Sequence, residues 1–143
     1  MNLDPLYTLI KEFEGLELMP YRCPAGVLTV GYGTTGQGVI EGVSWTKEAC
    51  EERMRVDVGR FVNGTLELCP ILGEPGNDNK LCAISDFSYN LGLGALSSST
   101  LRKRINSQDW EGAKTELVKW TRGGGKILPG LVRRRIAECK LLG

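Results

Sequence analysis

Glu14, Cys23 and Thr29 bring a carboxyl, a thiol and a hydroxyl together within one short segment of the chain. Eight residues separate Glu14 from Cys23, and five separate Cys23 from Thr29. Glycoside hydrolysis needs an acid beside the glycosidic oxygen and, on the other face of the sugar, a group that activates water or attacks directly. The segment therefore offers a proton donor and a candidate for the second group.

A helix is predicted to hold Glu14. Asp4 opens this helix with Pro5 in its first turn, and Gly15 stops it. Its apolar stripe consists of Leu3, Leu6, Leu9, Ile10 and Phe13. Glu14 then lies on the last turn, near the negative end of the helix dipole, which opposes ionisation. We expect a neutral carboxyl, as protonation of a leaving oxygen requires near neutral pH.

The second and third residues lie on a predicted hairpin between residues 19 and 33. Two prolines and a glycine interrupt this stretch, and residues 27–30 read as a strand. A hairpin would fold Cys23 and Thr29 back towards the end of the first helix. The helix end and the hairpin would then form two walls of a cleft that fits a sugar chain.

Each of these residues also has an ordinary structural interpretation. A glutamate at a helix end is usually solvated, and a single cysteine is usually a small buried hydrophobe. A threonine in a strand is there for its β-propensity. The chemical interpretation therefore depends on the whole run rather than on any one position.

The run from Glu14 to Gly33 resembles the active-site segment of the phage-type lysozymes, the endolysins that cut bacterial cell walls. That family has Glu, then Asp or Cys, then Thr at this spacing. Ser44–Ala49 resembles the start of the helix that links the family's two lobes, and Phe87–Gly92 resembles its cleft-lining motif. Trp120–Arg135 resembles its C-terminal signature, so the resemblance covers nearly the whole chain.

The resemblance implies a muramidase that cuts the β-1,4 bond between N-acetylmuramic acid and N-acetylglucosamine, without a cofactor or a metal. Glu14 would donate the proton, and Thr29 would hold water with its hydroxyl. Tyr89 and Asn90 would contact sugar faces and amide groups. Many relatives have Asp at position 23, whereas an unperturbed thiol has a pKa of about 8.5 and is mostly neutral. Cys23 can thus be a thiolate base, a nucleophile or a group that orients water.

A second departure is Thr34, which stands where the family often has a histidine; the chain has no histidine at all. This removes a group that titrates near neutral pH, and it excludes histidine triads and imidazole metal sites. The two departures leave open a module that binds peptidoglycan, or acts as a scaffold, without cutting it. A transglycosylase acting on the same bond is a third interpretation.

The expected fold is α+β and lysozyme-like, a single domain over residues 1–143 with a cleft between two lobes. A small β lobe covers about residues 15–45, and helices fill about residues 46–143, joined by helix 1–14. The expected helix starts are Thr46, Asn77 or Asp78, Ser98 or Ser99, and Ser107. Gly92 ends the third of the long helices, Gly123–Gly125 is a flexible break, and a last helix follows it.

Charge is distributed unevenly along the chain. Residues 1–76 have 6 Lys and Arg against 11 Asp and Glu, a net charge of −5, while residues 77–143 have 12 against 6, a net charge of +6. The basic runs 102–104 and 133–135 could attract an anionic wall or nucleic acid phosphates. A solvated helix surface is the favoured interpretation of each run. No aromatic residues alternate with the basic ones, as they do in proteins that bind single-stranded nucleic acid, so we expect no nucleic acid partner. The resemblance implies peptidoglycan as the partner, and we expect a monomer.

The five cysteines are odd in number and form no Cys-x-x-Cys pair, so at least one is free and neither a zinc ribbon nor a redox motif is expected. Reduced thiols suit synthesis in the bacterial host cytoplasm, with action on the wall in the periplasm. Residues 1–4 show no signal-peptide pattern, and no apolar run is long enough to span a bilayer. Some relatives carry an N-terminal membrane tether.

Overall fold

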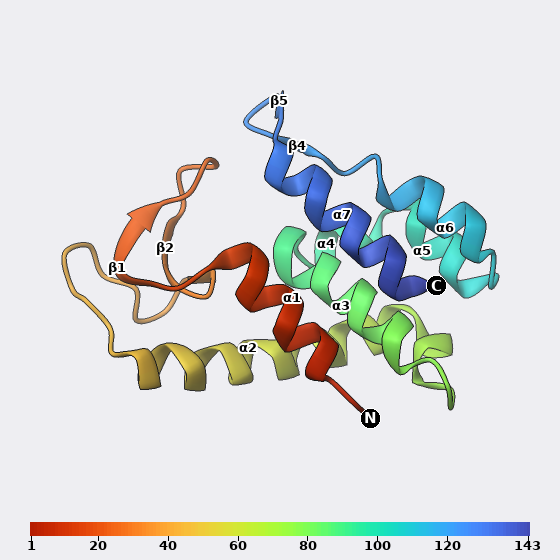
Figure 1. Cartoon of the computed structure of the whole chain (residues 1–143), viewed down its shortest axis with the longest axis horizontal. Helices are drawn as coiled ribbons and strands as arrows, with labels where there is room; N and C mark the ends of the chain where they lie inside the picture. The colour runs from red at the N-terminus through yellow and green to blue at the C-terminus, as the bar shows by residue number, and fades with distance from the viewer.

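The computed structural model describes all residues from Met1 to Gly143. In chain order its elements are α1 (Asp4–Glu14), β1 (Glu17–Arg22), β2 (Leu28–Gly31), β3 (Thr34–Thr35), α2 (Lys47–Leu68), the 3-10 helix η1 (Pro70–Gly73), α3 (Asp78–Leu91), α4 (Leu93–Ser97), α5 (Thr100–Asn106), α6 (Trp110–Leu117), β4 (Arg122–Gly123), β5 (Lys126–Ile127) and α7 (Pro129–Leu142). Figure 1 shows β1 and β2 at one end of the molecule and α3 to α7 gathered at the other. The predicted α+β class with a small β lobe is confirmed.

Helix α1 begins and ends where the sequence predicts. Asp4 is its first residue, after Leu3 at the N-cap, and Glu14 is its last. Gly15 adopts φ of 67°, a conformation that costs glycine little, and its amide bonds to Lys11 O at 3.2 Å. Glu14 therefore lies where the helix stops and the chain turns towards the sheet.

Strands β1, β2 and β3 form an antiparallel sheet in that order. Cys23 follows β1 and starts the turn of the first hairpin, because Gly26 N donates to Cys23 O at 2.8 Å and Cys23 N donates to Val27 O at 3.0 Å. In the hairpin register Tyr21 pairs with Thr29. The predicted hairpin is confirmed, with its second strand starting one residue later than expected.

Helix α3 is the centre of the helical part. Every residue from Leu81 to Ser88 is buried, because α1, α2 and α7 pack around it (Figure 1). Small side chains allow this close approach, as predicted for Ser85 and Ser88: Thr65 Oγ1 of α2 donates to Ser88 Oγ at 2.9 Å. Gly92, with φ of 95°, ends the helix, also as predicted.

Helix α2 joins the sheet to the helical part (Figure 1). Thr46 is its N-cap, and its hydroxyl accepts a hydrogen bond from Ala49 N at 3.1 Å, which confirms the predicted start. Likewise, Ser99 caps α5 by accepting from Arg102 N at 3.0 Å. Short-range caps of this kind are readable from sequence because both partners lie within a few residues.

Two local predictions are wrong. Ser107 does not start a helix, because it ends α5 and its hydroxyl donates to Arg104 O. The next helix starts two residues later, where Asp109 Oδ1 accepts from Gly112 N at 2.9 Å. Residues 123–125 are not a flexible break, since Gly123 belongs to β4 and the two glycines after it form the turn to β5. Gly124 and Gly125 have φ of 58° and 80°, which suits the two central positions of a tight hairpin turn.

The run 133–135 on α7 is not a solvated basic surface. Only Arg133 is exposed, whereas Arg134 and Arg135 retain 3% and 0% of their exposure. The expectation of a solvated surface is wrong for these two residues because α7 packs on α3, whose acidic and amide side chains accept hydrogen bonds from them.

All five cysteines are free thiols. Cys50, Cys69 and Cys82 are buried, while Cys23 and Cys139 are half-buried. Burial raises the pKa of Cys69 and of Cys82 to about 11, so these thiols stay neutral in the core. None of the helices combines the length and the apolar character that a membrane span requires.

Candidate active site

A cleft of about 520 Å³ lies between the β1–β2 hairpin, the end of α1 and the end of α3. All five residues predicted from the sequence line it: Glu14, Cys23, Thr29, Tyr89 and Asn90. They come from α1, from the hairpin and from α3, so the tertiary fold brings three separate segments to one hollow. The hollow holds a carboxyl, a thiol, a hydroxyl and an amide, the groups that the hydrolysis of a sugar bond can use.

The backbone after β2 packs closely on the Glu14 carboxyl. A Cβ atom built on Gly33 would lie 2.6 Å from Glu14 Oε1, and Gly33 has φ of 80°. Only glycine meets both conditions without displacing the acid. The Glu14 side chain retains 17% of its exposure, so its carboxyl borders the cleft without being free in solvent.

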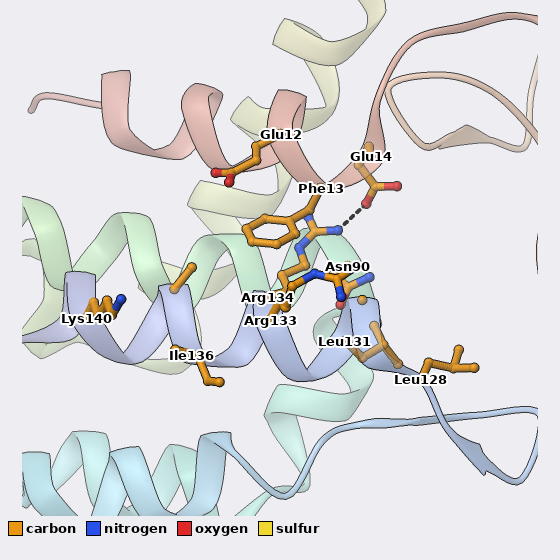
Figure 2. Close-up of a pocket in the computed structure, with 12 residues that line it drawn as sticks. Glu12, Phe13, Glu14, Asn90, Leu128, Leu131, Arg133, Arg134, Ile136 and Lys140 are labelled. Carbon is orange, nitrogen blue, oxygen red and sulfur yellow. Dashed lines mark hydrogen bonds and ion pairs between the residues drawn. The ribbon is translucent and has the colours of Figure 1, made fainter.

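Arg134 of α7 lies beneath Glu14 and joins it to Asp86 of α3. Its Nη1 donates to Glu14 Oε2 at 2.6 Å (Figure 2). Its Nε and Nη2 donate to Asp86 Oδ2 and Oδ1, both at 2.8 Å. The Arg134 and Asp86 side chains retain 3% and 0% of their exposure, so this is a buried, doubly hydrogen-bonded ion pair with a third contact to the acid.

Electrostatics within this group favour charged side chains. Burial alone would raise the pKa of Asp86, but attraction and hydrogen bonds from Arg134 outweigh burial and lower it. Burial alone would lower the pKa of Arg134, and the two carboxylates raise it instead. The Glu14 carboxyl therefore has the Arg134 guanidinium 2.6 Å away as well as the helix end that the sequence pointed to. Two sources of electrostatic field therefore act on Glu14, the dipole of α1 and the Arg134 guanidinium.

A second buried arginine holds Asn90. Arg135 Nη2 donates to Asn90 Oδ1 at 2.7 Å and to Glu138 Oε2 at 2.8 Å, and Arg135 Nε lies 2.7 Å from Glu138 Oε1. Burial, followed by the nearby Asp86 carboxylate, raises the pKa of Glu138, while Arg135 opposes the rise. With its oxygen bound to Arg135, Asn90 can offer a ligand in the cleft the two hydrogens of Nδ2.

The hairpin presents Cys23 and Thr29 to the cleft, and the two side chains differ in burial and in hydrogen bonding. The half-buried Cys23 thiol makes no hydrogen bond within the protein. Thr29 is 4% exposed and its Oγ1 donates to Val27 O at 2.9 Å. Since that hydrogen is already used, the Thr29 oxygen is left to accept a hydrogen bond from water.

Tyr89 is fixed on the helical side of the cleft. Its hydroxyl donates to Tyr32 O, and its ring meets Phe61 edge-on at 5.5 Å between centroids. Burial, and then the charge of Glu14, raise the pKa of Tyr89, so the phenol stays neutral. Tyr21 and Phe61 also line the cleft and add aromatic surface that the sequence did not single out.

Sequence reasoning missed Arg134 as the partner of the acid and Asp86 as the partner of Arg134. One available signal was that Asp86 is the only charged residue between Leu81 and Leu91, inside a run that reads as a buried helix. A second was that Leu131, Arg134 and Glu138 recur at helical spacing and so share one face of α7 with an apolar residue.

Comparison with known proteins decides the family. A model of the family described as "Phage lysozyme" matches residues 11–138. The chain belongs to the phage lysozyme family. It is 39% identical over 137 residues to an endolysin of Acyrthosiphon pisum secondary endosymbiont phage 1, an alignment that covers 93% of this chain and 91% of that relative. The family membership agrees with the expectation from Glu14, Cys23 and Thr29.

Other family members agree in sequence and in fold. The endolysin of Bacillus phage B103 is 38% identical over 135 residues, and the match covers 93% of this chain but 50% of that relative, so the chain spans half its length. The solved endolysin from Escherichia coli O157:H7 phage FAHEc1 superposes with a TM-score of 0.83 at 33% identity, over 99% of this chain and 93% of that one. The predicted lysozyme-like fold is thereby confirmed.

Proposed function

We propose that this chain is an endolysin-type muramidase that hydrolyses the β-1,4 bond between N-acetylmuramic acid and N-acetylglucosamine in bacterial peptidoglycan, causing lysis of the host cell. The observation that carries the proposal is the single cleft that Glu14, Cys23 and Thr29 line together. Family membership supports the same chemistry. No step of it calls for a cofactor or a metal.

Glu14 is the general acid in this proposal. It enters the reaction protonated and passes its proton to the glycosidic oxygen as the bond to the sugar breaks. The carboxylate that remains is stabilised by Arg134, already in place at 2.6 Å, so the charge that forms meets a preorganised partner. Asp86 holds that partner from behind.

Cys23 and Thr29 act on the opposite side of the sugar. Thr29 accepts a hydrogen bond from the incoming water, since its own hydrogen is bound to Val27 O. Cys23 activates that water as a thiolate, orients it as a thiol, or attacks the sugar itself. Tyr89 supports the sugar with its ring, and Asn90 donates from Nδ2 to an acetamido oxygen.

The wider setting follows from the same proposal. The chain forms one muramidase domain over residues 1–143, with a β lobe over about residues 15–45 and helices in the remainder. It works as a monomer, is made in the host cytoplasm and acts on the wall in the periplasm. Nucleic acid is not a partner, because two of the three arginines at 133–135 are buried and used inside the protein.

The test is Glu14→Gln, which keeps the side-chain shape and removes the proton. Clearing of a cell-wall suspension should fall by about 100-fold or more, since general acid catalysis contributes about 10²–10⁴-fold. Circular dichroism should remain that of a folded protein. Glu17→Gln, an exposed carboxyl at the start of β1, is the matched control. Near-normal clearing by Glu14→Gln would reject the assignment.

Product analysis separates the remaining alternatives. Mass spectrometry of digested wall should find reducing N-acetylmuramic acid ends; anhydro-muramic ends would identify a transglycosylase instead. A pure binding module would pellet with the wall and leave it intact. Cys23→Asp should keep hydrolytic activity if Cys23 acts on water, while Cys23→Ser should lower it if a thiolate is needed.

A further inference from the structure

A polar hollow of about 540 Å³ lies along α5, and we call it the serine hollow. It is lined by four serines together with Arg102, Lys103 and Asn106, and by no apolar residue. Figure 1 shows α5 at the end of the molecule opposite β1 and β2. No residue lines both the serine hollow and the cleft, so a ligand in the serine hollow leaves the sugar site open.

Arg102 lines the serine hollow with a charge that no carboxylate neutralises. Its Nε donates to Leu68 O at 3.0 Å, and its Nη1 donates to Ser97 O at 3.2 Å. These two carbonyls hold the guanidinium in place without offsetting its charge, and Arg102 takes part in none of the ion pairs. Since the half-buried side chain is already held, binding an anion costs it little further conformational freedom.

The surroundings of Arg102 are also positive. Residues 87–108 contain no Asp or Glu, and Lys103 is exposed and takes part in no ion pair. Arg104, the third cation of the run 102–104, pairs with Asp109 at 3.5 Å and does not line the hollow. The serine hollow therefore has two cations and no anion, which favours an anionic ligand.

The serines offer such a ligand hydrogen-bond acceptors. Ser98 Oγ donates to Gly94 O at 3.1 Å, and Ser107 Oγ donates to Arg104 O at 3.0 Å. Because these hydrogens are used within the protein, the two oxygens are left to accept hydrogen bonds from ligand hydroxyls. The hollow thus suits a molecule that carries both negative charge and hydroxyl groups.

We propose that the serine hollow binds the glycerol phosphate units of an anionic wall polymer. Each phosphodiester carries one negative charge on oxygens that Arg102 and Lys103 can bind, and each glycerol unit carries a hydroxyl that a serine oxygen can accept. The site holds the protein on the wall and takes no part in cutting it. The inference goes beyond the proposed hydrolysis and does not depend on it.

Two other polyanions fit the serine hollow less well. Proteins that bind single-stranded nucleic acid stack aromatic side chains on the bases, and no aromatic residue lines the hollow. Binding to a lipid surface grows with the apolar area buried in it, and no apolar residue lines the hollow either. A polar, phosphate-linked chain of polyols therefore matches the lining best.

The test measures sedimentation of Glu14→Gln protein with walls that carry poly(glycerol phosphate), and with the same walls after hydrofluoric acid has removed the polymer. Adding Arg102→Gln and Lys103→Gln should weaken binding to the first wall by about 2- to 25-fold, since each exposed ion pair changes binding by about 1.4- to 5-fold. Binding to the stripped wall should stay the same. An undiminished affinity of this variant for the polymer-bearing wall would overturn the inference.

Two further variants separate the site from loss of fold and from general attraction. Lys103→Gln alone alters an exposed side chain without a hydrogen bond or an ion pair, and it should still weaken binding by about 1.4- to 5-fold. Lys47→Gln with Arg55→Gln removes one lysine and one arginine from the exposed surface of α2, where neither forms an ion pair. This control should bind like the parent, and a loss as large as that of the hollow variant would refute a specific site.

A soluble probe and a lipid probe complete the test. Titration with sn-glycerol 3-phosphate should move the amide NMR signals of residues 97–107, whereas glycerol alone should leave them in place. If glycerol phosphate moves none of them, the site does not exist. Vesicles of phosphatidylglycerol present the same headgroup chemistry; if the protein sediments with them as strongly as with the polymer-bearing wall, the assignment to a wall polymer fails.

Discussion

The sharpest quantitative prediction concerns Arg134→Met. Methionine has a similar length but no charge, so the substitution removes two hydrogen bonds to Asp86 and one to Glu14. Asp86 has no exposed side-chain surface and would be left as a buried carboxylate without its cation. Arg134 is the main source of the low pKa of Asp86, which would then rise.

The expected loss of stability is large. Removing one partner of a buried ion pair costs about 3–5 kcal/mol. For a chain of 143 residues the unfolding entropy is about 0.3 kcal/mol per kelvin, so Tm should fall by about 10–17 °C. Activity should fall as well, because Glu14 loses the contact that holds it, and a displacement of about 1 Å can cost about 100-fold.

The double variant Asp86→Leu, Arg134→Met separates stability from positioning. Replacing a buried ion pair by apolar side chains is often neutral, so most of the lost free energy of unfolding should return. Activity should stay low, because Glu14 still lacks its guanidinium partner. Urea denaturation at pH 7 measures the first quantity, and clearing of wall suspensions measures the second.

Two results would refute this reasoning. One is an Arg134→Met variant whose free energy of unfolding lies within about 1 kcal/mol of that of the wild type. A change that small is typical of an exposed ion pair, so the Arg134–Asp86 pair would not behave as a buried one. The other is a double variant that regains wild-type activity together with stability, since the loss in the single variant would then reflect unfolding alone. Glu14→Gln gives the reference for loss of the acid with the Arg134–Asp86 pair intact.

Three other predictions concern the same region. Gly33→Ala should reduce kcat far more than binding of the wall, because its Cβ would lie 2.6 Å from Glu14 Oε1; unchanged kcat would contradict the close packing. An alkylating reagent at pH 8 should modify Cys23 first and stop wall clearing, while Cys69, whose pKa burial raises to about 11, should react only on unfolding. The native pKa of Asp86 lies below its unfolded value of about 3.9, so its stabilisation is present above pH 4 and disappears as pH falls through the native value. Urea denaturation at pH 5 and pH 3 should therefore show a smaller decrease in the free energy of unfolding for Asp86→Asn than for the wild type. Equal decreases would contradict the Asp86–Arg134 ion pair.

The sequence by itself determined the local structure around the chemistry. The end of α1 at Glu14 follows from Gly15, and the start of α2 follows from Thr46, because a cap and its partner lie within four residues. The hairpin that presents Cys23 could be predicted for the same reason. The sequence predicted Ser107 as the cap of α6, whereas the structure has Asp109 there, because the backbone turn between α5 and α6 decides which residue precedes the helix.

Only the tertiary structure decided what surrounds the acid. Arg134 lies 120 residues from Glu14 and 48 from Asp86 along the chain, so no local pattern joins them. Run 133–135 has the composition of a solvated surface, yet the packing of α7 on α3 buries two of its three charges. Ion pairs act through space and depend on burial, whereas caps and turns act along the chain. For that reason the sequence pointed to the acid, and the fold supplied the partner that holds it.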